Sequence, residues 1–212
     1  MRIASCNIFM GEDQESRTIA ICSMMKGEKP DVICMQEVTD YSIDYIRRVF
    51  PPSCWYYAFR HPYINNSTSR AYGEVIITQN PHSAASWAVL PSTQGRVVTW
   101  VDFGDLSIGT GHLESFRENS DLRSSQMNLI AEKGSKWLWI GDCNMQKHET
   151  YSQDGVLEIS GQHPTYFSNR FETGACSEKY DRAFCKGVTV SFSKQISIPT
   201  LSDHDIIVVD LE

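Results

Sequence analysis

Polar side chains able to do chemistry stand where apolar segments of this sequence begin or end. In chain order, these residues are Asn7, Gln36-Glu37, His112, Asp142, Asn144 and Asp203-His204. Strand ends that lie along one edge of a sheet hold such side chains rigidly around a shared cleft. Carboxylate and amide oxygens are ligands suited to Mg²⁺ or Mn²⁺, and two histidines can bind or polarise an anion. The pattern therefore indicates a metal site that acts on an anionic substrate.

Each of these residues also has a structural explanation when it is considered alone. Asp and Asn favour turns, so Asp142 and Asn144 can form a simple turn after a strand. Glu37 can cap the helix expected after it, and His112 can be a hydrogen-bonded structural histidine. Such explanations are common for single polar residues. The functional interpretation therefore depends on the complete, ordered set.

Strands and helices must place these residues at one edge of the molecule. Hydrophobic spacing predicts helices over 15–26 and 121–132, and a third helix between Thr39 and Pro51. Apolar runs bounded by turn residues predict strands over 2–7, 31–36, 55–59, 74–78, 86–90, 96–103, 106–111, 136–141, 180–185, 188–192 and 205–211. The polar segment 145–174 is expected to be a long functional loop. Helices scattered among neighbouring strands favour two packed sheets with the helices outside.

Composition limits the possible classes of protein. The chain has 212 residues and a mass of 24.1 kDa, which predicts a single domain over residues 1–212. Its net charge of −7 argues against a protein that coats nucleic acid through bulk electrostatics. No apolar run approaches the roughly 18 residues that span a bilayer, and the first residues read as a strand rather than a signal peptide. We therefore expect no membrane partner.

Cysteine usage indicates the compartment. The chain has seven cysteines, an odd number, and no Cys-x-x-Cys pair. Most lie in apolar runs, as Cys34 and Cys185 do, which favours buried free thiols over disulfides or a zinc site. The expected location is therefore intracellular, nuclear or cytoplasmic, without secretion.

The ordered motifs resemble the endonuclease/exonuclease/phosphatase (DNase I-like) superfamily. They are Ser5-Cys6-Asn7-Ile8, Met35-Gln36-Glu37-Val38, Gly111-His112-Leu113-Glu114-Ser115, Gly141-Asp142-Cys143-Asn144, Tyr180-Asp181-Arg182 and Ser202-Asp203-His204. Within it, the likeness is greatest to the tyrosyl-DNA phosphodiesterases that remove tyrosine from a DNA 5′ end. The stretches that favour this group are His112–Ser115 followed by Arg123 and Gln126, Pro91-Ser92-Thr93 with Arg96, and Pro164-Thr165-Tyr166. The resemblance implies an α/β (α+β) fold, a four-layer sandwich of two packed, mostly antiparallel β-sheets flanked by helices.

The resemblance also implies how the metal and the attacking water are held. Glu37 is expected to bind Mg²⁺ or Mn²⁺, with Asp203 and Asn7 nearby in the metal and phosphate network. Asp142 is expected to orient or deprotonate the water, and Asn144 to position the water and the phosphate.

The remaining implied roles concern the phosphate. His204 is expected to donate a hydrogen bond to a non-bridging oxygen as charge builds in the transition state. Asp181 holds His204 in its donating tautomer, as carboxylates that orient a histidine do. His112 and Ser115 contact the same phosphate.

The implied reaction is hydrolysis of a 5′-phosphotyrosyl bond, of the DNA-repair type, by a monomer. The partner is a single-stranded or frayed 5′ DNA end that carries a tyrosyl adduct, and a preference for DNA over RNA 5′ ends is left open. Tyr72 and Tyr166 are candidates to stack against terminal bases. The alternative for both tyrosines is that they pack into the sheets.

Other activities stay open because fold does not determine substrate. The same scaffold serves abasic-site endonucleases, exonucleases or deadenylases, and phosphoinositide phosphatases. The family's Gly-Asp-x-Asn segment usually continues to an arginine that helps to hold phosphate, whereas this chain has Gln146 there. That departure keeps a catalytically inactive binding module as a further alternative.

Overall fold

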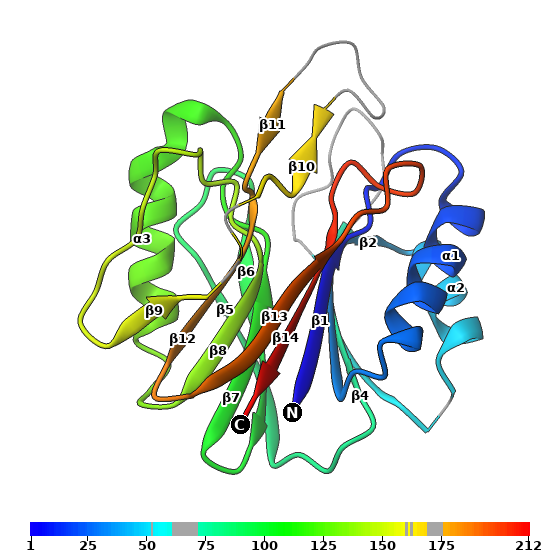
Figure 1. Ribbon diagram of the computed structural model, residues 1–212, viewed down its shortest axis with the longest axis horizontal. Helices are drawn as coiled ribbons and strands as arrows, with labels where there is room; N and C mark the ends of the chain where they lie inside the picture. The colour runs from blue at the N-terminus through cyan, green and yellow to red at the C-terminus, as the bar shows by residue number, and fades with distance from the viewer. Residues whose placement is uncertain (52, 61–71, 160, 162, 169–175) are drawn as a thin grey trace.

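Two six-stranded β-sheets face each other, and helices cover their outer faces, in the computed structural model of the chain (Figure 1). The structure describes residues 1–51, 53–60, 72–159, 161, 163–168 and 176–212, without the side chains of 56–60 and 72. The strand orders are β13-β14-β1-β2-β4-β3 in the first sheet and β5-β6-β7-β8-β12-β9 in the second. The predicted sandwich of two sheets with outer helices is therefore confirmed.

The first sheet contains the strands at both ends of the chain. They are β1 (Arg2–Asn7), β2 (Val32–Thr39), β3 (Trp55–Arg60), β4 (Tyr72–Thr78), β13 (Val190–Ile196) and β14 (Ile206–Leu211). β1 and β2 run parallel, and the other pairs in this sheet are antiparallel. β1 and β2 are buried along nearly their whole length because both of their faces are covered by other layers.

The second sheet contains the central strands of the chain. They are β5 (Ala84–Val89), β6 (Val97–Phe103), β7 (Leu106–Gly111), β8 (Trp137–Asp142), β9 (Val156–Glu158) and β12 (Asp181–Lys186). β7 and β8 run parallel, and the other pairs are antiparallel. A separate pair, β10 (Tyr166–Phe167) and β11 (Ser177–Glu178), stands at the top of the molecule in Figure 1. The predicted long loop over 145–174 thus contains two short strands, β9 and β10, which its polar sequence did not indicate.

In the described part of the chain, three α-helices lie outside the sheets, as the hydrophobic spacing predicted, and a 3-10 helix, η1 (Arg117–Asn119), precedes the third. α1 (Gln14–Gly27) and α2 (Ser42–Val49) pack on the first sheet, and α3 (Ser120–Ala131) packs on the second (Figure 1). α2 begins three residues after Thr39, whose hydroxyl accepts a hydrogen bond from the Ser42 backbone N–H at 3.2 Å. None of the helices among the described residues is long and apolar enough to cross a membrane.

Buried apolar residues form three clusters that correspond to the spaces between four layers. Ile21, Met25 and Met35 belong to the cluster between the helices α1 and α2 and the first sheet. Cys34 and Leu138 belong to the cluster between the two sheets. Met127, Trp137 and Trp139 belong to the cluster between the second sheet and α3. Neighbours on a strand, such as Cys34 and Met35, enter different clusters because successive side chains point to opposite faces.

The two termini lie together at one end of the sheets. The Met1 amino group donates a hydrogen bond to the Leu211 carbonyl oxygen at 2.7 Å. β1 runs from this end and reaches Asn7 at the other end, where β2 also finishes. Residues that follow β1 and β2 therefore gather far from the termini (Figure 1).

Candidate active site

Strand direction brings the polar residues of the first sheet to one edge. β1 and β2 are parallel, and the register pairs Asn7 with Gln36, so that Glu37 follows immediately. β14 is antiparallel to β1, so the residues that precede β14, Asp203 and His204, lie beside the end of β1. The Ser202 hydroxyl fixes this proximity, because it donates to the Asn7 carbonyl oxygen at 2.7 Å.

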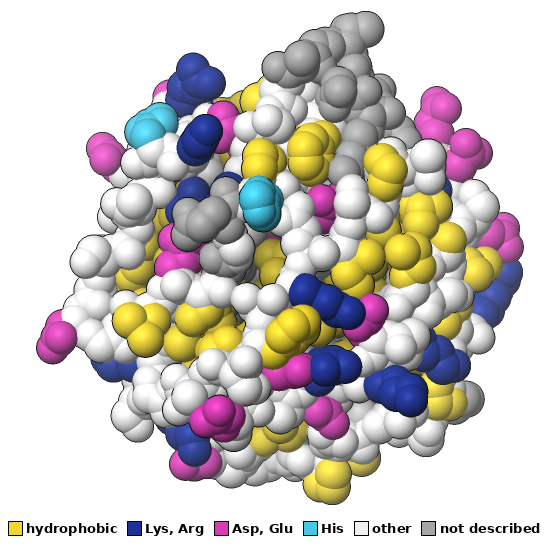
Figure 2. Space-filling model, in the orientation of Figure 1, with side chains coloured by type: hydrophobic (Ala, Val, Ile, Leu, Met, Phe, Trp, Pro, Cys, Tyr) yellow, Lys and Arg dark blue, Asp and Glu magenta, His cyan; other side chains and the backbone are white. Residues whose placement is uncertain are grey.

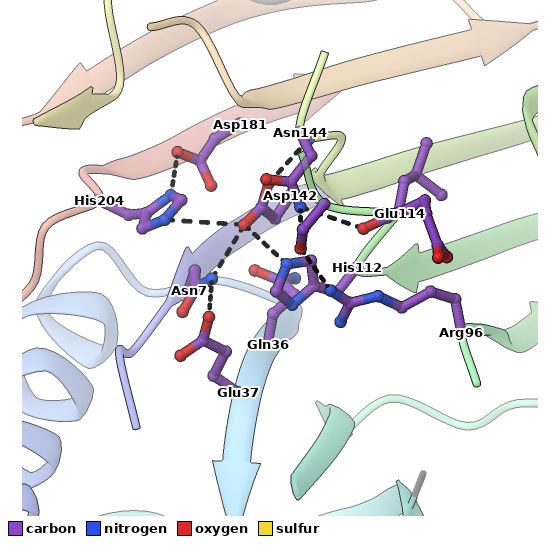
Figure 3. A network of polar contacts seen from close by, with 12 residues as sticks. Asn7, Gln36, Glu37, Arg96, His112, Glu114, Asp142, Asn144, Asp181 and His204 are labelled. Carbon is purple, nitrogen blue, oxygen red and sulfur yellow. Dashed lines mark hydrogen bonds and ion pairs between the residues drawn. The ribbon is translucent and has the colours of Figure 1, made fainter. Parts of the chain in front are cut away.

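The second sheet brings its residues to the same edge. His112 follows β7 and forms a parallel bridge with Asp142, the last residue of β8. Asp181 begins the antiparallel strand β12 and stands opposite Asp142 in the register. Segments that are distant in the sequence thus converge in the network of Figure 3.

Asp142 lies at the centre of this network and is 1% exposed. Its Oδ2 accepts a hydrogen bond from Asn7 Nδ2 at 3.0 Å, and it lies 3.3 Å from His112 Nε2 and 3.7 Å from His204 Nε2. Its Oδ1 accepts from the Asn144 backbone N–H at 2.9 Å. Burial opposes ionisation, but the two histidines and these hydrogen bonds hold the pKa of Asp142 below its ordinary value. Asp142 is therefore a carboxylate at neutral pH.

His204 is held between carboxylates. Its Nδ1 lies 2.8 Å from Asp181 Oδ2, and both residues are buried. Burial alone would lower the pKa of His204, but Asp181, Asp142 and Asp203 raise it well above the ordinary value. The ring therefore carries both N–H groups, one directed to Asp181 and one facing the site beside Asp142.

Glu37 projects from an irregularity in β2. The pairing of β2 with β4 shifts register between Met35 and Val38, and Glu37 has a φ of 57°. A bulge of this kind redirects a side chain out of the regular alternation. Glu37 Oε1 accepts from Asn7 Nδ2 at 3.1 Å, and Oε2 accepts from the Met10 backbone N–H at 2.9 Å. Asn7 thus links Glu37 to Asp142.

Glu37 and Asp203 fit an open divalent-cation site. Asp203 is 8% exposed, and burial together with the charge of Glu37 raises its pKa to about 6, although His204 opposes this. A cation between two such carboxylates would relieve their repulsion. No cluster of three His, Cys, Asp or Glu side chains able to hold a metal occurs among the described residues. Mg²⁺ commonly takes only one or two carboxylates, with water and substrate phosphate completing its shell, so this donor set suits it.

Ser115 and Arg96 form the opposite side of the site. Ser115 Oγ accepts a hydrogen bond from Arg96 Nη2 at 2.7 Å and lies 3.5 Å from Asn144 Nδ2. Arg96 is 2% exposed, and its Nε and Nη1 have no hydrogen-bond partner in the described part of the chain. The guanidinium therefore places a buried positive charge behind Ser115, on this side of the site. The sequence marked Arg96 only as part of a motif, and its place in the site is new.

Arg17 is a second residue whose part in the site was missed. It is 6% exposed on α1, and its Nη1 donates to the carbonyl oxygens of Ile8 and Leu201 at 3.1 and 2.8 Å. Its Nη2 donates to the Phe9 carbonyl oxygen at 2.9 Å. Arg17 thus joins the segment after Asn7 to the segment before Asp203. The sequence offered one sign of this role, because Arg17 lies in the helix predicted over 15–26, on the face that carries its apolar residues.

The candidate substrate residues are placed as follows. The Tyr166 ring lies 5.0 Å from the His204 ring and 4.8 Å from the Tyr180 ring, between centroids, so Tyr166 borders the site. Tyr72 begins β4, and its side chain lies outside the described residues. Gln146 is buried, and its Nε2 donates to the Tyr180 hydroxyl at 3.2 Å. Gln146 therefore supports Tyr180, the residue against which the Tyr166 ring packs.

The fold and the site define a class of protein. The chain belongs to the Endonuclease/Exonuclease/phosphatase family, whose model matches residues 4–204. Members of this family are hydrolases that act on phosphodiester bonds and generally use divalent metal ions. Comparison with curated proteins finds no match.

Solved structures share the whole fold at low sequence identity. TDP2 of D. rerio in complex with a single-strand DNA product is 20% identical, with a TM-score of 0.81 over 100% of this chain and 98% of that chain. The endonuclease/exonuclease/phosphatase from Bacteroides vulgatus is 18% identical, with a TM-score of 0.80 over 100% and 98%. The human Nocturnin catalytic domain with a bound sulfate anion is 16% identical, with a TM-score of 0.78 over 100% and 93%. These likenesses confirm the predicted DNase I-like fold.

Proposed function

We propose that this chain is a Mg²⁺- or Mn²⁺-dependent phosphodiesterase that hydrolyses the 5′-phosphotyrosyl bond between a protein tyrosine and a nucleic-acid 5′ end. The products are a 5′-phosphorylated strand and a free tyrosine or tyrosyl peptide. The observation that carries the proposal is the ionised, buried Asp142, contacted by Asn7, His112 and His204 at 3.0, 3.3 and 3.7 Å. This is an arrangement for attack of water on a phosphorus atom.

Asp142 and Asn144 act on the nucleophile. Asp142 is ionised and accepts the proton of the water, or orients its lone pair, at Oδ2. The Asn144 side chain is fixed by its donation to the Leu113 carbonyl oxygen at 3.0 Å, and it lies between Asp142 and Ser115. It positions the water and the phosphate relative to each other.

Positively charged groups converge on the phosphate. His204 donates from Nε2 to a non-bridging oxygen, while Asp181 accepts from Nδ1 and holds the ring in place. Ser115, held by Arg96 Nη2 at 2.7 Å, and His112, whose Nε2 lies 3.3 Å from Asp142, offer further polar contacts. Donors fixed before the reaction stabilise transition-state charge without reorganising. Glu37 and Asp203, with Asn7 in the same network, would hold the divalent cation, which when bound supplies further charge to the phosphate oxygens.

The leaving group supports a phosphotyrosyl substrate. A phenol has a pKa of about 10, several units below that of a sugar alcohol, so a phenolate departs with less protonation. Asp142 is ionised and Asp181 accepts from His204 Nδ1, so neither is placed to protonate the leaving group. With His204 assigned to a non-bridging oxygen, the leaving group departs without a dedicated proton donor, which favours a phenolate over a sugar alkoxide.

A single-stranded or frayed 5′ end is the proposed partner, with the protein acting as a monomer. TDP2 of D. rerio, which has the same fold, was solved with a single-strand DNA product. Figure 2 shows acidic and basic side chains interspersed on the face seen, which fits recognition at a strand end rather than along a basic band. Tyr166, beside His204, is the proposed stacking surface for a terminal base. Buried thiols support an intracellular, nuclear or cytoplasmic location.

A two-substrate gel assay tests the proposal. A 5′-phosphotyrosyl oligonucleotide and a duplex with an abasic site are incubated with the protein and Mg²⁺, with and without EDTA. We expect tyrosine release and a 5′-phosphate on the first substrate, and loss of this activity with EDTA. Cleavage of the abasic duplex without tyrosine release would assign the site to another nuclease. An RNA oligonucleotide with the same adduct decides between DNA and RNA.

A further inference from the structure

Phe116 combines strong exposure with a backbone conformation that a bulky residue rarely adopts. It directly follows Ser115 and is 64% exposed. Its φ of 71° and ψ of 144° lie in a region occupied mainly by glycine. A large apolar side chain is normally explained by its burial in the core, but the Phe116 ring is exposed. The backbone conformation at this position also disfavours a residue as bulky as phenylalanine. Residues held in such conformations occur preferentially at functional sites.

Buried contacts hold the Phe116 backbone in place. Its carbonyl oxygen accepts from Arg123 Nη1 at 2.7 Å and from the Asn119 backbone N–H at 3.2 Å. Arg123 is fully buried, donates also to the Glu114 carbonyl oxygen at 3.0 Å, and pairs with Glu149 at 2.6 Å. The segment from Glu114 to Phe116 is therefore fixed at several points while the Phe116 ring faces solvent. An exposed ring carried on a fixed backbone can bind another ring without ordering the chain that carries it.

The position of Phe116 in the site indicates which part of a substrate it meets. Figure 3 shows His204 and Arg96 on opposite sides of Asp142. Tyr166 lies against His204, whereas Ser115 Oγ is hydrogen-bonded to Arg96, so the backbone of the next residue, Phe116, lies on the Arg96 side. A 5′-phosphotyrosyl phosphate carries a nucleoside on one ester oxygen and a tyrosyl ring on the other. If the Tyr166 ring stacks on the terminal base, the tyrosyl leaving group lies on the Arg96 side of the phosphate.

We propose that Phe116 contacts the aromatic ring of the departing tyrosyl residue and so selects aryl leaving groups. The inference rests on the proposed function and adds a residue that determines its specificity. Aromatic pairs prefer edge-to-face or offset arrangements, which an exposed ring on a fixed backbone can offer to an incoming phenol. Phe116 does no chemistry itself and lowers the free energy of the bound substrate and of its transition state.

Kinetics on the 5′-phosphotyrosyl oligonucleotide test this role. Phe116→Leu, which removes the aromatic ring but keeps an apolar side chain, should lower kcat/KM by a factor of about three to ten. Phe116→Tyr should retain activity close to that of the wild type. The matched control is Phe192→Leu, which changes an exposed phenylalanine on β13, and it should leave kcat/KM unchanged. Equal activity of Phe116→Leu and wild type would overturn the inference and leave the proposed function intact.

A second substrate identifies the ring that Phe116 contacts. The same oligonucleotide is made with an abasic 5′-terminal nucleotide, so that only the tyrosyl ring remains next to the phosphate. We expect the loss caused by Phe116→Leu to persist on this substrate. If the loss disappears, the terminal base is the partner and the inference is wrong. If the wild-type protein releases no tyrosine from either substrate, the proposed function and the inference fail together.

Thermal unfolding separates this role from a structural one. Phe116→Gly relieves the backbone conformation, so it should raise the Tm while lowering kcat/KM, as expected where strain serves function. A lower Tm for both Phe116→Gly and Phe116→Leu would show that the ring stabilises the fold, which would overturn the inference.

Discussion

At the scale of single residues, the site depends on how one carboxylate is kept ionised inside the protein. Asp142 is buried, which opposes its charge, yet Asn7, Asn144 and two histidines surround it with N–H groups. The same arrangement raises the pKa of His204, because its positive charge faces Asp181 and Asp142. The cluster therefore holds a base and a cationic donor side by side at neutral pH. Such separation of pKa values is how acid and base roles are assigned in enzymes.

The role of Asp142 is tested by Asp142→Asn. The amide keeps the size of the side chain but cannot accept a proton, so the rate of tyrosine release should fall by a factor on the order of a hundred or more. Circular dichroism should show an unchanged fold. Asp105→Asn, at an exposed aspartate paired with Lys136, is the control and should keep the native rate. Native turnover by Asp142→Asn would remove Asp142 from its assigned role.

Glu37 is the residue on which the proposed cation depends most. Glu37→Gln removes one of the two carboxylate charges while its amide oxygen still accepts from Asn7. Because even residues that only orient a metal ligand change affinity by about tenfold, the Mg²⁺ concentration for half-maximal activity should rise by about tenfold or more. A Mg²⁺ titration of both proteins measures this. An unchanged midpoint would place the cation elsewhere.

At the scale of elements, the edge of the sandwich is built from strand ends, and the loops between them are fixed by buried arginines. Arg17 connects the loops that carry Asn7 and Asp203, and Arg123 connects α3 to the loops after β7 and β8. Both side chains donate mainly to backbone carbonyl oxygens, so they determine the path of the chain rather than contact substrate. Loops that would otherwise be mobile thus hold their residues as rigidly as the strands do.

The Arg123–Glu149 pair predicts a pH-dependent stability. Burial opposes the charge of Glu149, but its hydrogen bonds with Arg123 hold its pKa below the ordinary value. The pKa of a glutamate in the unfolded chain is about 4.3. Because the pKa of Glu149 is lower in the folded protein, its charge stabilises the fold at any pH above about 4.3. This stabilisation is lost as the pH falls through the pKa of the folded state. Glu149→Gln should therefore lower the free energy of unfolding by about 2 kcal/mol at pH 7, with a difference that shrinks below about pH 4.

Urea unfolding of both proteins between pH 3 and pH 8 measures this difference. Glu132→Gln, at an exposed glutamate that follows α3, is the control and should match the wild type throughout. A difference between Glu149→Gln and wild type that stays constant down to pH 3 would contradict an electrostatic origin.

At the scale of the whole molecule, the sequence predicted the layers well, because they follow from local patterns. Apolar runs identified the strands to within a few residues, and the polar residues at their ends converge as expected. The sequence could not show that β2 is irregular at Glu37, that Arg96 lies beside Ser115, or that Phe116 is exposed. These features depend on residues that are far apart in the chain and meet only after folding. The short strands β9, β10 and β11 were missed because they are too short to show an alternating pattern; β9 pairs with β12, and β10 pairs with β11.

The layered core also predicts the reactivity of the thiols. All the cysteines except Cys176 are buried, and burial raises the pKa of Cys22 and Cys34 to about 12. A buried thiol with a raised pKa is a poor nucleophile. Alkylation of the native protein with iodoacetamide, followed by peptide mapping, should therefore label Cys176 first and the others only after unfolding. Rapid labelling of Cys34 in the native protein would contradict the packing described between the sheets.

The position of the two termini has a practical consequence for the use of this protein. The amino group of Met1 and the carbonyl of Leu211 are in direct contact, at the end of the sheets remote from Asp142. A tag, a fluorescent fusion or a tether to a solid support can therefore be attached at either terminus without crossing the path of an incoming strand. A molecule immobilised through both termini would therefore direct the edge that carries Asp142 toward the solution.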